Sequence, residues 1–522
     1  MTDNRTQFFD VPEKILMELQ NHQIALMSSK KATREAPAFT WVVILLVMLL
    51  SLMPGAERSA RMANGITEIS RNKLVLTTPP DSRISGSLRY ALSFPFQADV
   101  TTAGLMVMRM IEETPNYGFL DGSDVVLFDE LTQDSPKSIF AASRNEIDKA
   151  KPGIPQRLFL KSPLIGGFVP RRALTVNGAP HPHAGTGFGV GQAHWFRFAD
   201  DRFTWRDPER RDMNEVYQLA YDGKTFASRR SSVRTQNGDD PLRIADSGWS
   251  ILVTGISSAI PDGDDLLLPA LGARLDRKGV GVGVVRWART QETWQPVAYD
   301  PVVTTEDSVP LGPNPMERCP WMEPTLARDR DGSLLFSARG ADAFSKPGVK
   351  NPELGYTLRL WRSARPRDWK QVLDAPKARL NSPVSINVAA DGTAYLVSNP
   401  YHPAFIPETQ ETGRGREKLV VWPLTEDRNS VEPFRLIRDC LVDFGKPPTG
   451  AEAEKWMADH PNGLTVRFRD GWHHILCYRI CHSPRYRASG VPPSLHSGSY
   501  IEEVRSRGPV QPIWRFAKES LH

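Results

Sequence analysis

The stretch from Glu323 to Gly340, EPTLARDRDGSLLFSARG, constrains the fold more than any other part of the chain. Two short apolar runs are joined by Asp331-Gly332, and Asp-Gly between such runs is a strong β-hairpin signal because both turn residues need a positive φ. Strands of about six to eight residues are roughly 20–27 Å long. An antiparallel pair therefore places Glu323 and Arg339 at the same end of the hairpin. There they form either an exposed salt bridge or part of a binding site.

The same hairpin signature recurs along the chain. Apolar or aromatic runs also flank Asp121-Gly122, Asp222-Gly223, Asp262-Gly263, Asp391-Gly392 and Asp470-Gly471. Radial repetition of four-stranded sheets is the β-propeller solution to unpaired sheet edges. We therefore predict an all-β propeller over residues 61–522, six-bladed within a range of five to seven, with these six Asp residues at turns between strands.

Composition supports many turns and excludes one class of partner. The 522 residues include 43 Pro and 38 Gly, and this usage favours turns over long helices. The net charge is only +5, and no dense basic run is interleaved with aromatic residues. We therefore expect no nucleic-acid partner.

Residues 1–60 form a separate N-terminal region. Ala36 to Ala56 is uncharged, with the apolar run WVVILLVMLL from Trp41 to Leu50, and basic residues precede it. The run is interpreted as a membrane anchor, as a signal peptide if translation starts at Met27, or as a buried core helix. Basic residues on its N-terminal side predict that the rest of the chain is secreted, periplasmic or membrane-anchored outside the cytoplasm.

The cysteines fit an exported chain. There are four, Cys319, Cys440, Cys477 and Cys481, enough for one or two disulfides. Cys477 and Cys481 lie in one predicted strand, so their Cα atoms are roughly 13 Å apart and cannot be bridged. No CxxC pair occurs, which argues against a zinc-finger site.

Three stretches resemble blades of the sialidase-like (BNR repeat) propeller superfamily. They are Glu323-Pro324 with its hairpin and Arg339, the run SPVSI at 382–386 with its Asp391-Gly392 hairpin, and LRLWRSARPRDWKQV at 358–372. In the last, Ser363 and Trp369 stand where an Asp-box has its Ser and Trp, but Arg365 and Arg367 replace its Asp and Gly. The Phe-Arg-Ile-Pro motif of sialidases is absent. The resemblance covers roughly residues 64–515.

This resemblance implies roles for particular residues. Sialidases hold a substrate carboxylate with three arginines, whose guanidinium forks match a carboxylate bidentately. By position, Arg339 and Arg479 resemble members of that triad, and Arg171 or Arg172 stands in for the first arginine. Glu323 resembles a pocket acid, and Tyr478 lies beside Arg479 as a candidate nucleophile. Adjacent strand residues face opposite sides, so Tyr478 and Arg479 share a pocket only if a bulge intervenes.

Two further clusters carry polar chemistry. His181 and His183 lie in the small-residue loop PHPHAGTG, which suits ligand contact, metal binding or ordinary loop packing. Two histidines alone do not make a metal site, and we expect no metal and no cofactor. Asp459-His460 precedes a predicted strand. There His460 can transfer protons with Asp459 orienting it, unless Asp459 is only a loop cap.

Two functions follow from these patterns. The first is an exported, sialidase-like glycoside hydrolase, with Glu323, Asp459, His460 and Tyr478 as catalytic candidates. Its binding candidates are Arg171, His181, His183, Arg339 and Arg479. The second is a non-catalytic propeller that binds a glycan or a protein, favoured by the missing motif and the degenerate Asp-box. A third, weaker possibility is a glycosidase that uses Glu323 and Asp459 as a carboxylate pair. The expected partner is a carbohydrate, with membrane association through the N-terminal segment if it is uncleaved.

Overall fold

A computed structural model describes most of the chain beyond residue 128. Side chains are described throughout 257–290, 293–307, 318–341, 353–389, 391–401, 416–445, 456–480 and 500–505, and in shorter stretches between 129 and 253. Several further strands are described by their backbone alone. The predicted N-terminal region lies outside the described residues. Within the part that is described, no helix has the length and apolar character needed to cross a membrane.

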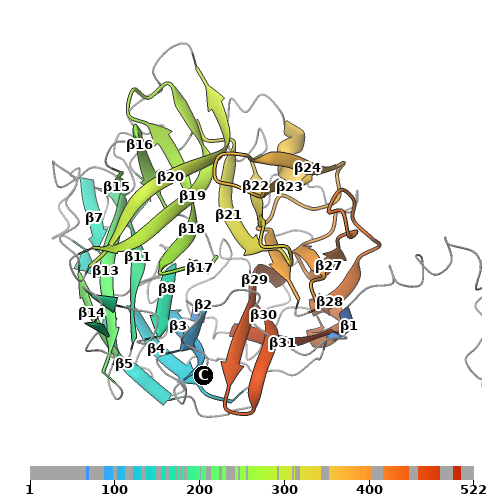
Figure 1. Cartoon of the computed structure of the whole chain (residues 1–522), viewed down its shortest axis with the longest axis horizontal. Helices are drawn as coiled ribbons and strands as arrows, with labels where there is room; N and C mark the ends of the chain where they lie inside the picture. The colour runs from blue at the N-terminus through green and yellow to red at the C-terminus, as the bar shows by residue number, and fades with distance from the viewer. Residues whose placement is uncertain are drawn as a thin grey trace, which may run out of the picture. The chain divides into compact units, whose positions relative to one another are not determined.

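The described chain is all-β (Figure 1). Four sheets have four strands each, and every strand is hydrogen-bonded to the next one across its sheet. In that order they are β2 (Leu88–Gln97), β3 (Ala103–Ile111), β4 (Gly122–Phe128) and β5 (Lys137–Arg144); β21 (Trp321–Arg328), β22 (Leu334–Gly340), β23 (Leu358–Ser363) and β24 (Lys370–Ala375); β25 (Ser385–Val388), β26 (Ala394–Ser398), β27 (Lys418–Pro423) and β28 (Arg435–Asp439); and β1 (Ile66–Ile69), β31 (Gly498–Ser506), β30 (Gly471–His482) and β29 (Trp456–Phe468).

Two larger sheets follow β5 and precede β21 in the sequence. Two short helices are also described. One sheet contains β6 (Glu146–Ile147), β7 (Pro155–Phe159), β8 (Ile165–Pro170), β11 (Gly185–Ala199), β12 (Arg202–Arg206), β13 (Met213–Tyr221) and β14 (Phe226–Arg230). The other contains β15 (Leu242–Arg243), β16 (Trp249–Leu252), β17 (Ile260–Asp262), β18 (Asp265–Arg274), β19 (Gly279–Thr290) and β20 (Thr293–Glu306). A ribbon of β9 (Thr175–Val176) and β10 (Ala179–Pro180) stands apart, and the helices are η3 (Pro352–Tyr356) and α4 (Cys440–Phe444).

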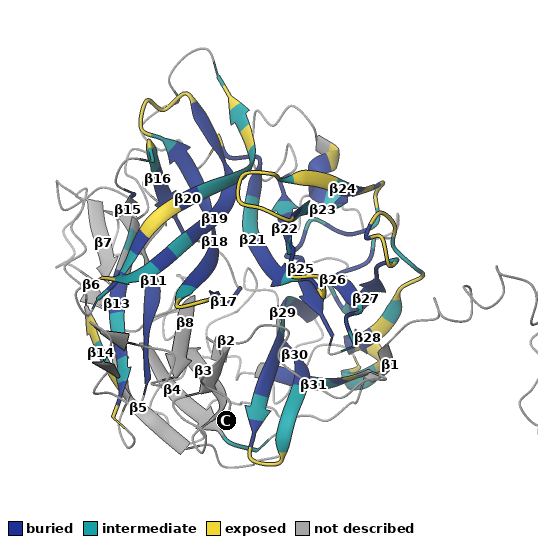
Figure 2. Ribbon diagram, viewed as in Figure 1, coloured by how far each residue is buried: buried dark blue, intermediate teal, exposed yellow. Residues whose placement is uncertain are grey.

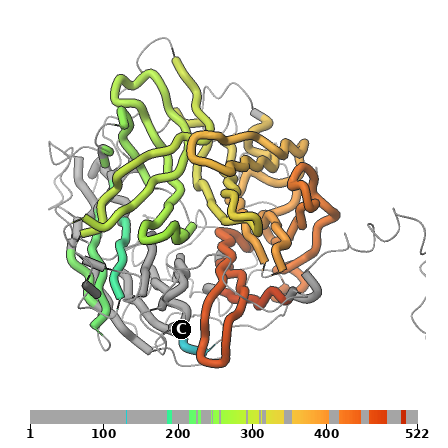
Figure 3. Tube along the Cα trace, in the orientation of Figure 1, coloured from blue at the N-terminus to red at the C-terminus, as the bar shows by residue number. Residues whose placement is uncertain are grey.

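The buried residues lie mainly on the strands (Figure 2), and their side chains form core clusters that join successive sheets. Trp321 and Phe336 pack with Val282 of the preceding sheet. The sheets β21–β24 and β25–β28 share a second core cluster, and β25–β28 shares a third with β29–β31. Strands β18, β21, β25 and β29 contact one another in that order. The sheets therefore follow one another in chain order, which the colours trace in Figure 3.

The predicted propeller is confirmed, but the predicted six blades are not. Five sheets contain described side chains, and these support a five-blade arrangement; the sheet β2–β5 is described almost entirely by its backbone. The Asp-Gly count is a poor guide because it reports hairpins and not blades. Asp331, Asp391 and Asp470 each precede the second strand of a hairpin, and Asp222 lies between β13 and β14. Asp121 is outside the described residues.

The turns themselves differ from the prediction in their backbone. Only the glycine has a positive φ, +87° at both Gly332 and Gly392, so the expectation of two left-handed residues is wrong at these turns. The aspartate instead accepts a backbone hydrogen bond two residues on, 2.9 Å from Asp331 Oδ1 to Ser333 N and 2.9 Å from Asp391 Oδ1 to Thr393 N. This Asx-type bond lets the turn form with one left-handed residue.

The last sheet is closed by the first strand of the chain. β1 pairs antiparallel with β31, with Ile69 opposite Val504. Tyr500–Val504 lies in this sheet as part of β31. Closure therefore joins the two ends of residues 66–506 in one sheet.

Polar contacts also link neighbouring sheets. Arg428 donates to both carboxylate oxygens of Asp329 at 2.8 and 3.1 Å, and both side chains are buried. Trp369, the residue in the Asp-box position, donates from Nε1 to Asp300 Oδ2 at 2.9 Å. The degenerate box therefore fixes one blade to the one before it.

Candidate functional site

Two inner strands are interrupted by a bulge. The pairing of β21 with β22 shifts between Met322 and Thr325, and that of β29 with β30 shifts between Asp459 and Asn462. Inside each bulge one residue has a left-handed backbone: Glu323 at φ +48° and His460 at φ +54°. Each is followed by a proline in the sequence. A bulge re-aims side chains, and here Glu323 Oε1 and His460 Nε2 lie 3.8 Å apart.

Glu323 and Arg339 form the pair that the hairpin predicts. Arg339 Nη1 donates to Glu323 Oε2 at 3.1 Å. The same guanidinium donates from Nε to the side-chain oxygen of Asn381 at 2.9 Å. Asn381 lies just before β25, so this fork connects two neighbouring blades.

Asp459 is the buried centre of the arrangement. It lies opposite Arg479 in the β29–β30 ladder and accepts a bidentate bond from it, at 2.6 and 3.2 Å. Arg416 Nη1 donates to Asp459 Oδ2 at 3.0 Å, and its Nη2 donates to the Asn381 carbonyl at 2.7 Å. His460 Nδ1 is 2.9 Å from Asp459 Oδ1. One carboxylate thus orients two arginines and a histidine.

Arg379 adds a fourth guanidinium. Its side chain is fully buried, and Nη1 donates to the carbonyls of Leu380 and Ser382 at 2.8 and 2.7 Å. Its Nε and Nη2 have no hydrogen-bond partner among the described residues. Burial, reinforced by the positive charge of Arg339, lowers the pKa of Arg379 to about 9. Such N–H groups are costly to bury without an acceptor.

We call these seven side chains the arginine–carboxylate cluster: Glu323, Arg339, Arg379, Arg416, Asp459, His460 and Arg479. Burial raises the pKa of the Asp459 carboxyl, but the charge of Arg479 and the hydrogen bonds from His460 and Arg479 outweigh it, and the net pKa is well below the usual range. Burial likewise raises the pKa of Glu323, and Arg339 and His460 reverse the effect to a net lowering. Burial and Arg479 lower the pKa of His460.

These shifts fix the charge of the cluster near neutral pH. Both carboxylates are ionised, His460 is neutral, and four guanidiniums face the two carboxylates, so these seven described side chains alone carry an excess of two positive charges. Glu323 is 18% exposed, Arg339 14% and His460 12%, whereas Asp459 is 0% exposed. Glu323, Arg339 and His460 therefore reach solvent, whereas Asp459 is fully buried beneath them.

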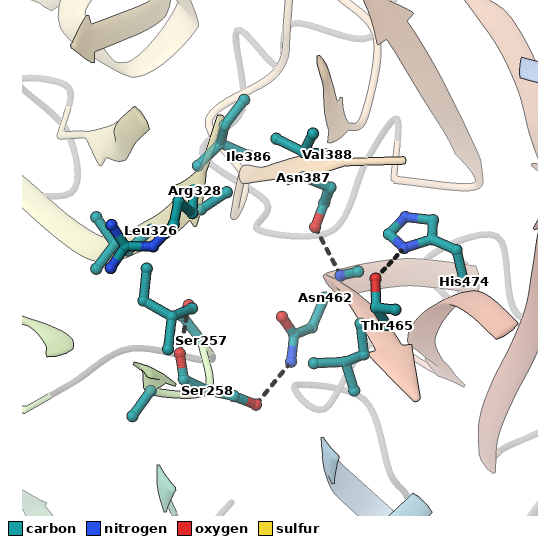
Figure 4. Close-up of a pocket in the computed structure, with 15 residues that line it drawn as sticks. Ser257, Ser258, Leu326, Arg328, Ile386, Asn387, Val388, Asn462, Thr465 and His474 are labelled. Carbon is teal, nitrogen blue, oxygen red and sulfur yellow. Dashed lines mark hydrogen bonds between the residues drawn. The ribbon is translucent and has the colours of Figure 1, made fainter. Parts of the chain in front are cut away.

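A separate cavity lies further along the same inner strands (Figure 4). Its volume is about 40 Å³, and Asn387, Asn462 and Thr465 are among its lining residues. At about 10–15 Å³ per water, this space suits a few water molecules and no sugar. His474 borders it, bonded to Thr465 at 3.1 Å.

The structure brings together five of the nine residues singled out from sequence: Glu323, Arg339, Asp459, His460 and Arg479. Tyr478 lies on the other face of β30, as the alternation of a strand requires. It donates to Glu502 at 2.6 Å and accepts from Arg438 at 3.0 Å inside the core. The bulge on this hairpin is in β29 and not in β30, so Tyr478 and Arg479 still face opposite sides of their strand.

The remaining predicted residues, Arg171, His181 and His183, lie outside the residues whose side chains are described. Sequence reasoning missed Arg379, Asn381 and Arg416. Only Asn381 had a signal, because the adjacent Ser382-Pro383 repeats the X-Pro of Glu323-Pro324 and His460-Pro461 just before a third inner strand. In the described part of the chain, no group of three or more His, Cys, Asp or Glu residues is placed to hold a metal ion.

No protein-family model matches the chain, and no curated protein matches it. Solved structures do. A protein of unknown function from Dyadobacter fermentans is 12% identical, with a TM-score of 0.44 over 84% of this chain and 100% of its own. An alpha-L-arabinanase from Penicillium chrysogenum complexed with arabinobiose is 11% identical, with a TM-score of 0.41 over 84% and 98%. The hemagglutinin-neuraminidase of Parainfluenza Virus 5 is 9% identical, with a TM-score of 0.37 over 83% and 95%.

Proposed function

We propose that the arginine–carboxylate cluster binds the carboxylate of an acidic sugar, and that the chain acts on glycans that carry such sugars. The observation that carries this proposal is that four guanidinium groups face only two carboxylates in the cluster, and that one of them, Arg339, is 14% exposed. A carboxylate supplies what these groups lack, because it accepts several charge-assisted hydrogen bonds and removes positive charge.

Within this proposal, hydrolysis of a glycoside is the reaction that the sialidase-like resemblance implies. Glu323 and His460 are the proton-transfer candidates because both reach solvent. Asp459 fits an orienting role better than an acid role, since it is saturated by Arg479, Arg416 and His460. Tyr478 is a poor nucleophile candidate because burial and Glu502 raise its pKa well above the usual value.

Non-catalytic glycan binding is the second candidate, and one observation favours it. A glycoside hydrolase needs a carboxylic acid that stays protonated, which requires a raised pKa. Both carboxyl groups of the cluster have a lowered pKa. The cluster therefore binds an anion more readily than it protonates a leaving group.

Calorimetric binding tests the proposal. N-acetylneuraminic acid, glucuronic acid and galacturonic acid should bind wild-type protein, and neutral galactose should not. Arg339→Ala should weaken acid binding about ten- to a hundred-fold, because a hydrogen bond to a charged group contributes about 1.5–3 kcal/mol. Arg328→Ala, which removes a guanidinium bound to Asp262 instead, is the matched control. Equal binding of galactose and the acids would refute the proposal.

Catalysis and location need assays of their own. A panel of fluorogenic glycosides, sialosides included, separates hydrolysis from mere binding. We also propose that residues 61–522 lie outside the cytoplasm, with membrane association through the N-terminal segment if it remains uncleaved. Cell fractionation with protease protection tests this, and a protease-protected propeller in the cytoplasm would contradict it.

A further inference from the structure

The backbone strain in this molecule is concentrated at two facing residues. Five described non-glycine residues have a positive φ. Arg277, Arg367 and Arg428 lie in the connections β18–β19, β23–β24 and β27–β28, where left-handed residues are ordinary. Glu323 and His460 lie inside strands and directly before proline, where extended backbone is preferred. Such residues cost on the order of 1–3 kcal/mol each and cluster at functional sites.

Hydrogen bonding decides which ring nitrogen of His460 carries the proton. The carboxylate of Asp459 only accepts hydrogen bonds, so the 2.9 Å contact assigns the imidazole proton to His460 Nδ1. Nε2 then carries the lone pair and lies 3.8 Å from Glu323 Oε1, and the two side chains are 12% and 18% exposed. A neutral imidazole held in this way is a base. A proton taken up at Nε2 creates an imidazolium between two carboxylates, which stabilise it.

Hydrolysis and elimination make different demands on such a site. Hydrolysis needs a proton donor for the leaving oxygen from the start, and neither carboxyl group of the cluster is protonated. Elimination from a uronic acid needs a base for the proton next to the carboxylate. It also needs cations on that carboxylate, since negative charge builds up there in the transition state. The cluster has one neutral base and an excess of guanidinium groups.

We propose that the cluster cleaves uronic-acid glycans by β-elimination, with His460 as the base. This inference rests on the proposed function, because it needs the carboxylate of an acidic sugar to be held by the arginines. It names the sugar as a uronic acid, whose ring carbon C5 bears both the carboxylate and a hydrogen, and the glycosidic oxygen as the one on C4.

The step balances without water, metal or redox change. His460 Nε2 removes the C5 hydrogen as a proton, and the electron pair left on C5 spreads into the carboxylate held by the arginines. That pair then forms the C4=C5 double bond as the C4–O4 bond breaks, and the electrons of the broken bond leave on O4. The proton on His460 passes to O4, which restores neutral imidazole. The products are a new chain end at O4 and an unsaturated uronate.

Glu323 and Asp459 are positioning residues in this step. Asp459 holds the Nδ1 proton and so leaves the lone pair on Nε2. Glu323 stabilises the imidazolium from the other side. Glu323→Gln should therefore lower kcat and move the acid limb of the pH–rate profile to lower pH, because it removes a charge that favours protonated His460. A purely structural role would leave that limb where it is.

The experiment treats polygalacturonate, alginate and hyaluronate with the purified full chain. Elimination gives ultraviolet-absorbing products whose masses sum to that of the substrate, whereas hydrolysis adds the mass of one water and no absorbance. We expect elimination with at least one polymer. His460→Ala and His460→Gln should lower the rate about 10²–10⁴-fold with galacturonic acid binding retained. His473→Ala, a histidine of the neighbouring strand bonded to Glu503, is the control that keeps its rate.

Each other outcome overturns the inference in a distinguishable way. Products heavier by one water, or elimination that both His460 variants retain, would mean that His460 is not the eliminating base. Binding of galacturonic acid with no product from any polymer would leave a binding propeller. Failure of galacturonic, glucuronic and N-acetylneuraminic acids to bind at all would remove the proposed function together with the elimination.

Discussion

Tyr395 and His474 come from neighbouring blades, and the tyrosine hydroxyl lies 2.6 Å from Nε2 of the imidazole. Tyr395 is in β26 and His474 in β30, and both side chains are buried. Thr465 contacts the other ring nitrogen. The histidine is therefore held neutral at an interface between blades, and burial lowers its pKa to about 4.

We predict that acid weakens the fold through His474. The folded-state pKa lies below the ordinary value of 6.5, so between these values the unfolded chain takes up the proton and the folded chain does not. The stabilisation is complete above about pH 6.5 and falls by about 3 kcal/mol as the pH drops to about 4. Urea unfolding of wild type and His474→Gln at pH 7 and pH 4.5 checks this. A loss of stability that is equally steep in the variant would contradict it.

Asp459→Asn should cost more stability than its small change of shape suggests. The substitution leaves Arg479 and Arg416 without the charge that they share, and breaking a buried ion pair costs about 3–5 kcal/mol. Asp374→Asn is the matched control, because its pair with Arg359 is half exposed and contributes about 1 kcal/mol or less. Equal unfolding midpoints for the two variants would show that Asp459 is not a structural centre.

The Asp329–Arg428 pair should show strong coupling. Arg428→Met leaves the buried Asp329 carboxylate without its bidentate partner and should cost about 3–5 kcal/mol. Asp329→Asn combined with Arg428→Met should cost less than the sum of the single changes, because no buried charge is stranded. A cycle of four denaturation curves measures this. The exposed Arg274–Asp276 pair serves as the additive reference.

The buried cysteines should react with a thiol reagent only after the protein unfolds. Cys319, Cys440 and Cys477 are buried thiols, so these three form none of the disulfides that four cysteines in an exported chain allow. Burial raises the pKa of Cys440 further. A maleimide should leave all three unmodified in native protein and label them in urea, as followed by peptide mass spectrometry. Rapid labelling of Cys440 in native protein would contradict its placement.

Local sequence signals predicted the hairpins well because they depend on neighbours in the chain. Asp331-Gly332 and Asp391-Gly392 do lie between paired strands, and an antiparallel hairpin does bring Glu323 and Arg339 together. The blade count was less predictable, because a turn signal does not say which strands it joins.

The rest of the cluster could not be read from the sequence for a physical reason. A residue before proline is expected to be extended, so nothing indicates that Glu323 and His460 are left-handed. Arg379 and Arg416 lie in connections without a motif, and tertiary packing alone brings Arg416 to Asp459 and Asn381 and buries Arg379 near Arg339. Tyr478 shows the opposite case, since strand alternation was enough to separate it from Arg479.

The pairing of β1 with β31 has a consequence for protein synthesis. Ile69 is synthesised 435 residues before its partner Val504 (504 minus 69). At about 5–20 residues per second, β1 waits on the order of tens of seconds for the strand it must pair with. Earlier blades can assemble during this interval, but the ring cannot. The last sheet therefore forms only after β31 has been synthesised, and a nascent chain stalled before β31 exposes an open edge to chaperones.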